Sequence, residues 1–160
     1  MKRALTVATM ICALVSALIA QAPPSFAGKW TLVPDANAPA GGGRGMGGLG
    51  QTATITQDAN TLTITRTTQM GEITSTYKLD GSESKNTLNM QGNSIDQLSV
   101  AKWDAGKLKI NTKMDFQGNP VETSLVLSLD ASGNLVAEST RPDFQGGGAP
   151  ITTKMTYKKG

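Results

Sequence analysis

The sequence has no histidine and only one cysteine, Cys12. Histidine is the commonest general base and the commonest metal ligand in proteins, so its absence excludes most triad enzymes and most zinc sites. Paired carboxylates remain available for acid–base chemistry, but the acidic residues stand mostly in predicted turns or at solvent-facing strand positions. We therefore expect no catalytic residue, no metal site and no cofactor, and we predict that the protein is not an enzyme.

Basic clusters and aromatic residues are also scarce. Aromatic residues make up 4% of the sequence, and 15 basic residues stand against 12 acidic ones. The lysines are spread singly along the chain, whereas a nucleic-acid surface needs a basic patch or interleaved aromatic side chains. We expect no nucleic-acid partner.

Long apolar runs are absent except at the start of the chain. Two basic residues precede an uncharged, apolar run that ends at Ala20, and two prolines follow soon after it. This order is typical of a secretory signal peptide. A transmembrane anchor needs a longer run, and this one is also interrupted by hydroxyl side chains. We predict a Sec-type signal peptide over residues 1–20.

Export sets further expectations for the mature chain. The cut falls after Ala20, Ala22 or, at the latest, Ala27, and a proline directly after Ala22 disfavours that position. Cys12 lies in the leader, so the mature chain has no cysteine and the core alone must hold the fold in an oxidising compartment. We predict a single domain over residues 21–160 that is secreted or periplasmic in a bacterium.

The clearest structural pattern lies in residues 107–130. Two runs of alternating apolar and polar residues flank the turn QGNP, which predicts a β-hairpin with one face toward a core. We expect Phe116 to pair with Val121. That register places Ile110 opposite Leu127 on the side that faces the core.

The rest of the chain repeats this pattern at a spacing of roughly ten residues. No stretch after the leader shows the apolar period of 3.6 that marks a helix. The predicted strands cover residues 28–33, 51–57, 61–67, 72–79, 86–91, 98–103, 107–116, 121–130, 134–140 and 151–157. Such successive hairpins predict an all-β fold, an antiparallel up-and-down meander that closes into a barrel of 8–10 strands.

Residues 34–50 form a glycine-rich stretch that also contains two prolines. Glycine amides can cradle a phosphate, but no Lys-Ser or Lys-Thr pair follows the glycines, so the pattern of a phosphate-binding loop is absent. We expect either a flexible flap over an opening of the barrel or a plain solvated loop.

An outer-membrane barrel would use similar strands with the apolar face toward lipid. The predicted strands are too short for this on average, their apolar faces are interrupted by serine and threonine, and the girdles of aromatic residues are missing. We therefore expect no membrane insertion, and we predict that the apolar face points inward.

The segment Gly28-Lys29-Trp30, followed by a long loop and a meander, resembles the lipocalin and calycin group of β-barrels, including small secreted bacterial domains of that kind. The resemblance implies that Trp30 lies at the closed end of the barrel, with residues 34–50 over the open end. It also implies an arginine stacked on Trp30, for which Arg141 is the candidate. The family's T-D-Y motif has no counterpart in this sequence.

Three functions are compatible with such a barrel. The first is a non-catalytic module that binds a small apolar molecule, with a lining formed by Trp30, Tyr77, Met114, Phe116 and Met155. If these side chains are core instead, each stabilises the fold by roughly 1.5–3 kcal/mol on burial. The second is a filled barrel that serves as a structural or protein-interaction module of the cell envelope. The third, catalysis by carboxylates, needs two acids on the inward face, where the alternation places none clearly.

Overall fold

The computed structural model describes residues 22–34, 48–68, 71–90, 93–116, 118–143 and 147–160. The predicted leader and residues 35–47 of the glycine-rich stretch lie outside these ranges. The strands are β1 (Gly28–Leu32), β2 (Thr52–Gln57), β3 (Thr61–Thr68), β4 (Gly71–Lys78), β5 (Glu83–Met90), β6 (Asn93–Asp104), β7 (Lys107–Phe116), β8 (Asn119–Leu129), β9 (Leu135–Arg141) and β10 (Ile151–Lys159). The described ranges contain no helix long and apolar enough to cross a membrane.

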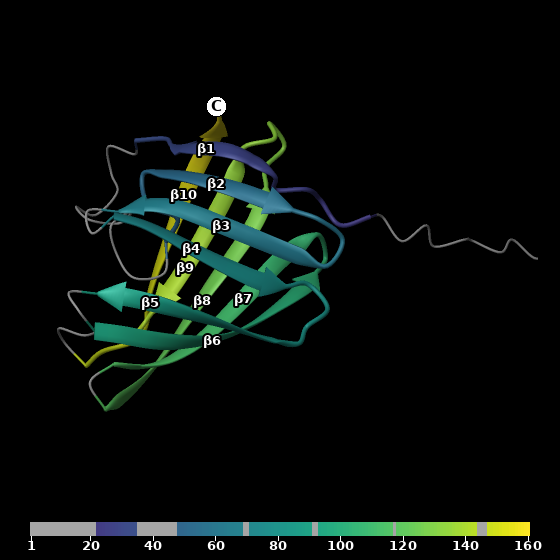
Figure 1. Ribbon diagram of the computed structural model, residues 1–160. Helices are drawn as coiled ribbons and strands as arrows, with labels where there is room; N and C mark the ends of the chain where they lie inside the picture. Colours follow the sequence, from purple (N-terminus) through teal and green to yellow (C-terminus); the bar gives the residue numbers. More distant parts are fainter. Residues whose placement is uncertain (1–21, 35–47, 69–70, 91–92, 117, 144–146) are drawn as a thin grey trace, which may run out of the picture.

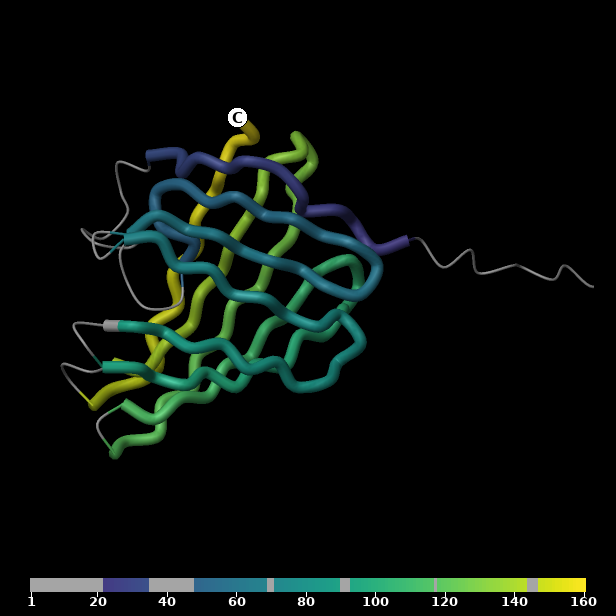
Figure 2. Tube along the Cα trace, viewed as in Figure 1, coloured from purple at the N-terminus to yellow at the C-terminus, as the bar shows by residue number. Residues whose placement is uncertain are grey.

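All ten strands belong to one antiparallel sheet in the order β4-β3-β2-β1-β10-β9-β8-β7-β6-β5. The sheet curls until its two edge strands, β4 and β5, lie beside each other and nearly close a barrel (Figure 1). In Figure 2, strands β1 to β4 cross in front of β7 to β10, which form the opposite wall. The predicted all-β, up-and-down meander is confirmed, with ten strands.

The seam between β4 and β5 is closed by side chains in place of a backbone ladder. Asn86 acts like a peptide group, because its Oδ1 accepts from the Thr76 backbone N–H at 2.8 Å and its Nδ2 donates to the Thr76 C=O at 3.0 Å. Beside it, Ser84 Oγ accepts from the Lys78 backbone N–H at 2.8 Å. These side chains cover two strand edges that would otherwise be unpaired.

Strands β7 and β8 form the predicted hairpin, but the predicted register is wrong by two residues. Phe116 pairs with Asn119 rather than with Val121, and Ile110 pairs with Leu125. Because side chains alternate with a period of two, a shift of two residues leaves each of them on its predicted face. The apolar side therefore still faces the core.

The turn of this hairpin explains the shift. Gly118 has a φ of 82°, which favours glycine, and its N–H donates to Asp115 Oδ1 at 2.6 Å. The strands therefore pair closer to the turn than the QGNP pattern suggested. The observed register also sets Lys113 opposite Glu122, with 3.1 Å between Nζ and Oε1.

Apolar side chains fill one half of the barrel, next to the turns at residues 58–60, 79–82, 105–106 and 130–134, and we call this the apolar half. Its largest members are at most 2% exposed. They are Phe26, Trp30, Leu62, Leu108, Leu127, Leu135 and Tyr157. Each such side chain stabilises the fold by roughly 1.5–3 kcal/mol on burial, so this half holds most of the hydrophobic stability.

Trp30 lies in the apolar half, and its Nε1 donates to the Phe26 C=O at 2.8 Å. The cation beside its ring is Lys159, whose Nζ lies 5.7 Å from the ring centroid. The prediction of Arg141 in that place is therefore wrong, because β9 carries Arg141 at its far end. A Cβ at Gly28 would lie 2.7 Å from Lys159 Cε, so glycine at this position leaves room for the lysine.

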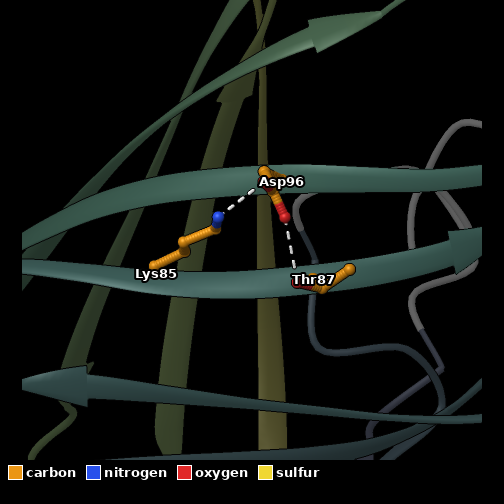
Figure 3. Close-up of polar contacts among 3 residues, drawn as sticks. All are labelled: Lys85, Thr87 and Asp96. Atoms are coloured by element: carbon orange, nitrogen blue, oxygen red, sulfur yellow. Dashed lines mark hydrogen bonds and ion pairs between the residues drawn. The ribbon is translucent and has the colours of Figure 1, made fainter.

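The outer face carries polar side chains that pair across the strands. Lys85 Nζ lies 2.7 Å from Asp96 Oδ2, and Thr87 Oγ1 donates to Asp96 Oδ1 at 3.0 Å (Figure 3). Both charged side chains are more than half exposed, so the ion pair adds little stability. Its use is to favour the register of β5 and β6, in which Thr87 is opposite Asp96.

Candidate ligand pocket in the polar half of the barrel

Toward the other end of the same strands the inward positions become polar, and we call this part the polar half. The alternation of inward and outward side chains continues, but hydroxyl, amide and guanidinium groups take many of the inward positions. These residues are Arg66, Ser75, Gln97, Ser99, Thr112, Thr123, Ser139, Arg141 and Thr153. The interior therefore changes from apolar to polar along the barrel.

A pocket lies within the polar half. Its walls are formed by Arg66, Tyr77, Gln97, Ile110, Thr112, Met114, Thr123 and Leu125. The volume available to water-sized molecules is about 30 Å³, which is room for about two waters. Pockets for drug-sized ligands are typically about 300–1,000 Å³. A larger molecule can therefore enter only if the walls move apart.

Arg66 is the charged group of this pocket. It follows Leu62 and Ile64 on the inward face of β3, is half-buried, and donates from Nη1 to the Gly48 C=O at 2.6 Å. Among the described residues, no carboxylate forms an ion pair with it. A guanidinium has five N–H donors, so several remain for another partner.

Arg141 brings a second guanidinium to the polar half. It is half-buried and follows Thr140, which pairs with Ser124, so it lies beside Thr123. The carboxylates on the ten strands are all exposed; they are Glu72, Glu83, Asp96, Asp104, Asp115, Glu122 and Glu138. The polar half therefore has two inward positive charges and, on its strands, no inward negative one.

Two tyrosines have raised pKa values: Tyr77 is half-buried on the pocket wall, and Tyr157 is buried in the apolar half. Burial raises the pKa of Tyr77, against smaller lowering effects from the Arg66 charge and a hydrogen bond with Ser75. Burial likewise raises the pKa of Tyr157 to about 12, and its hydroxyl donates to the Gly50 C=O at 2.9 Å. Both hydroxyls are therefore protonated at neutral pH and available as neutral hydrogen-bonding groups.

Other polar groups of the pocket pair with one another. The hydroxyls of Ser99 and Thr112 lie 2.8 Å apart, and Gln97 Nε2 lies 3.7 Å from Met114 Sδ. Throughout the described ranges, no buried side-chain nitrogen or oxygen lacks a partner. Because a thioether is a weak acceptor, Gln97 can exchange that contact for a ligand oxygen at little cost.

The residues that line the pocket include no carboxylate. In the part of the chain that the structure describes, no group of three or more acidic, histidine or cysteine residues could hold a metal ion. Catalysis by carboxylates would need two inward acids, and every acid on the strands points outward. What the walls supply is a positive charge, neutral hydrogen-bonding groups and apolar surface.

The structure separates the five predicted lining residues. Tyr77 and Met114 border the pocket. Trp30 and Met155 belong to the buried core cluster, and Phe116 is half-buried at the last position of β7. These three do not border the pocket, and a role for them in binding stays a prediction.

The sequence prediction did not single out six of the pocket residues. They are Arg66, Gln97, Ile110, Thr112, Thr123 and Leu125. The alternation in the hairpin places its four members on the inward face, but an inward position does not tell core from pocket. One signal for the pocket was present in the sequence. Arg66 follows Leu62 and Ile64 at the next inward position of its strand, and a charged residue at such a position is unusual for a packed core.

No protein family and no curated protein matches this sequence. Solved structures, however, match it in fold. Zebrafish ileal bile acid-binding protein complexed with cholic acid has a TM-score of 0.54 and 20% identity, and the match covers 84% of this chain and 98% of that chain. An Asn-to-Ala mutant of the fluorescent protein UnaG has a TM-score of 0.54 and 21% identity, covering 84% and 96%. At such identities the likeness is one of fold, and that fold is a calycin-type β-barrel.

Proposed function

We propose that this protein is a non-catalytic binding module that holds a small, mainly apolar molecule with an acidic group in the polar half of its barrel. The observation that carries the proposal is Arg66, a half-buried guanidinium on the pocket wall with no carboxylate partner among the described residues. The bile acid-binding protein of similar fold is complexed with cholic acid, which is itself acidic and largely apolar.

The contacts available to such a ligand differ along the pocket. An acidic group at Arg66 would form charge-assisted hydrogen bonds, each worth about 1.5–3 kcal/mol. Tyr77 and Gln97 offer neutral hydrogen bonds, while Ile110 and Leu125 offer apolar surface. A molecule with one acidic end and an apolar body matches this distribution.

Binding also requires the pocket to widen, because its present volume of about 30 Å³ is far below that of a ligand. The seam between β4 and β5 is the place where widening costs least. Side-chain hydrogen bonds from Asn86 and Ser84 join these strands, whereas each other neighbouring pair has a backbone ladder. We infer that the seam loosens when a ligand enters.

The test is a titration with anilinonaphthalene sulfonate, a fluorescent dye with an apolar body and one sulfonate, and with cholate as competitor. We expect the dye to bind, cholate to displace it, and Arg66→Gln to weaken dye binding at least roughly tenfold, the equivalent of about 1.4 kcal/mol. Arg66→Lys keeps the positive charge and is expected to lose less. Lys113→Gln removes an exposed lysine from the outer face and serves as the matched control.

The outcomes separate charge recognition from simple apolar binding. Equal dye affinity in Arg66→Gln and in the unchanged protein would contradict a role for Arg66. A neutral dye such as Nile red should bind Arg66→Gln and the unchanged protein alike, because it has no group for the guanidinium. The absence of any fluorescence change with either dye would reject the binding module itself.

The second candidate is a filled barrel that acts as a structural or protein-interaction module. The small pocket volume favours it, since room for about two waters is what a well-packed barrel interior retains. A thermal unfolding series with cholate and the two dyes distinguishes the candidates. A binding module gains stability as ligand concentration rises, whereas a filled barrel does not.

A further inference from the structure

Three residues just before β2 are folded against the interior of the barrel. They are Gly48, Leu49 and Gly50, and we call them the inner segment. Gly48 and Leu49 are buried, and Leu49, at 1% exposed, belongs to the same core cluster as Ile64 and Tyr157. The inner segment lies outside the ten strands, so its burial does not follow from the pairing of the sheet.

Two side chains of the barrel hold the backbone carbonyls of the inner segment. Arg66 Nη1 donates to the Gly48 C=O at 2.6 Å, and the Tyr157 hydroxyl donates to the Gly50 C=O at 2.9 Å. An oxygen this close to a guanidinium nitrogen occupies a place that an acidic oxygen of a ligand would take. The inner segment therefore presents to the interior an oxygen for Arg66 and, next to it, the apolar side chain of Leu49.

We propose that the inner segment and the ligand compete for one site, in which the acidic group replaces the Gly48 carbonyl at Arg66 and the apolar body replaces the Leu49 side chain. This inference rests on the proposed function and adds the place where each part of an acidic amphiphile lies. It also gives a reason for the small pocket volume of about 30 Å³, because the inner segment already fills space beside Arg66. Loosening of the seam gives the ligand a way in, and release of the inner segment gives it room.

Gly50 allows the competition to be tested without a change in the pocket. Its φ is 75°, which favours glycine, and a Cβ at this position would lie 3.0 Å from the Thr67 carbonyl oxygen. Gly50→Ala therefore disfavours the buried position of the inner segment, while Arg66 and the other pocket residues stay the same. Because a ligand binds more tightly when the competing form is less populated, this variant should gain affinity.

The experiment is the titration with anilinonaphthalene sulfonate, carried out on Gly50→Ala and a matched control. We expect Gly50→Ala to bind the dye roughly fivefold more tightly than the unchanged protein, although it melts at a lower temperature. The control is Gly133→Ala, in the turn between β8 and β9, where φ is 78° and no atom lies within 4 Å of the added Cβ. It should also lose stability, but its dye affinity should not change.

Leu49→Ala tests the apolar part of the same site. Removal of this side chain vacates space for a ligand, so we expect tighter binding of both the sulfonate dye and the neutral Nile red. Leu135→Ala is the matched control, because Leu135 is equally buried but lies on β9 in the apolar half. It should lower stability without a gain in affinity. A Leu49→Ala protein that binds both dyes no better than the unchanged one would overturn the proposal.

Hydrogen exchange detects the displacement directly. Bound ligands commonly slow the exchange of nearby amides, whereas a ligand that expels the inner segment should speed exchange at the Leu49 amide when cholate is added. Slower or unchanged exchange there would contradict displacement.

The outcomes also separate this inference from the function on which it rests. An unchanged protein that binds neither dye would reject the binding module and the competition together. Dye binding by the unchanged protein, with no gain in Gly50→Ala, would overturn the competition alone.

Discussion

On strand β8, Leu127 is fully buried in the apolar half, while Leu125, two residues away on the same face, borders the pocket. The residue type, the strand and the direction are the same, yet the surroundings differ. Both residues belong to the buried core cluster, but Leu125 also lines the pocket together with Thr112 and Thr123. The comparison shows that facing inward is not a single environment in this barrel.

Under the proposed function, the two halves divide stability and recognition between them. Large side chains such as Trp30 and Tyr157 are buried in the apolar half. The polar half buries Ser99 and Gln97 in hydrogen-bonded pairs and keeps Arg66 without an acidic partner among the described residues. Polar groups held in this way add less to stability than apolar burial, but they can exchange partners with a ligand.

The largest expected effect is the replacement of Leu127 by alanine. Its site is enclosed and cannot fill with water, so the free energy of unfolding should fall by about 3–5 kcal/mol. Leu125→Ala is the matched control, and we expect it to cost about half as much because its cavity would merge with a pocket that can admit water. Urea denaturation measures both. Equal losses at the two positions would mean that the halves do not differ in packing.

The seam should show the next largest effect. Asn86→Ala removes two hydrogen bonds that join β4 to β5, so we expect a loss of about 2 kcal/mol. Under the proposed function, dye association should also become faster, because the seam opens more readily. Asn111→Ala, at an exposed outward position of β7, should change neither quantity. Stopped-flow mixing and urea denaturation give the two readings, and a slower association in Asn86→Ala would contradict the seam as the place of opening.

A smaller effect is expected where a side chain of the apolar half contacts backbone beyond it. Tyr157→Phe removes the hydrogen bond to the Gly50 C=O and should cost about 1 kcal/mol. In the unchanged protein, the ultraviolet absorbance of tyrosinate should show one group that ionises with a pKa of about 12, and this step should disappear in Tyr157→Phe. If Tyr157 instead ionised with the ordinary tyrosine pKa of 10, water would reach its hydroxyl.

The smallest effect concerns the turns next to the apolar half, where exposed aspartates accept hydrogen bonds. The Asn60 N–H and the Thr61 side chain lower the pKa of Asp58, and the Ser82 hydroxyl and N–H lower that of Asp80. The Asn134 side chain lowers the pKa of Asp130 in the same way.

Because these pKa values are lower in the folded chain, the aspartates stabilise it above their ordinary value of 3.8, and this contribution is lost as the pH falls through the folded values. We expect the melting temperature to decline below about pH 4. Asp58→Asn should decline less steeply than Lys113→Gln, which leaves the turns intact. Parallel curves would mean that acid unfolding begins elsewhere, for example at the ion pair of Lys85 and Asp96.

Much of the fold could be predicted because it depends on local pattern. Alternation over residues 107–116 placed Ile110 inward, and the same rule assigned faces along the other strands. The register of β7 and β8 could not be read in this way, since it depends on the conformation at Gly118 and the bond that Asp115 accepts there. A shift of two residues is invisible to a pattern whose period is two.

The candidate site was less predictable than the fold. Tyr77 and Met114 were singled out as large inward side chains and do border the pocket. Trp30 and Met155 have the same character but lie in the core, because the curvature of the sheet brings other apolar side chains against them. Sequence alternation gives the side of the sheet, but not the distance to the wall across the barrel.

The order of polar and apolar residues by itself determined that this chain forms short antiparallel strands in a meander. It also determined that the inner face is mainly apolar and that the outer face is rich in threonine and lysine. These properties follow from neighbours in the sequence, since alternation and turn residues act over two to four positions. Only closure of the sheet decided which inward residues became core and which became pocket. Pairing of β1 with β10 put Lys159 beside Trp30, and closure set Asn86 against Thr76 across a seam without a ladder. Local alternation determines neither contact, and the second exists only once the two edges of the sheet have met.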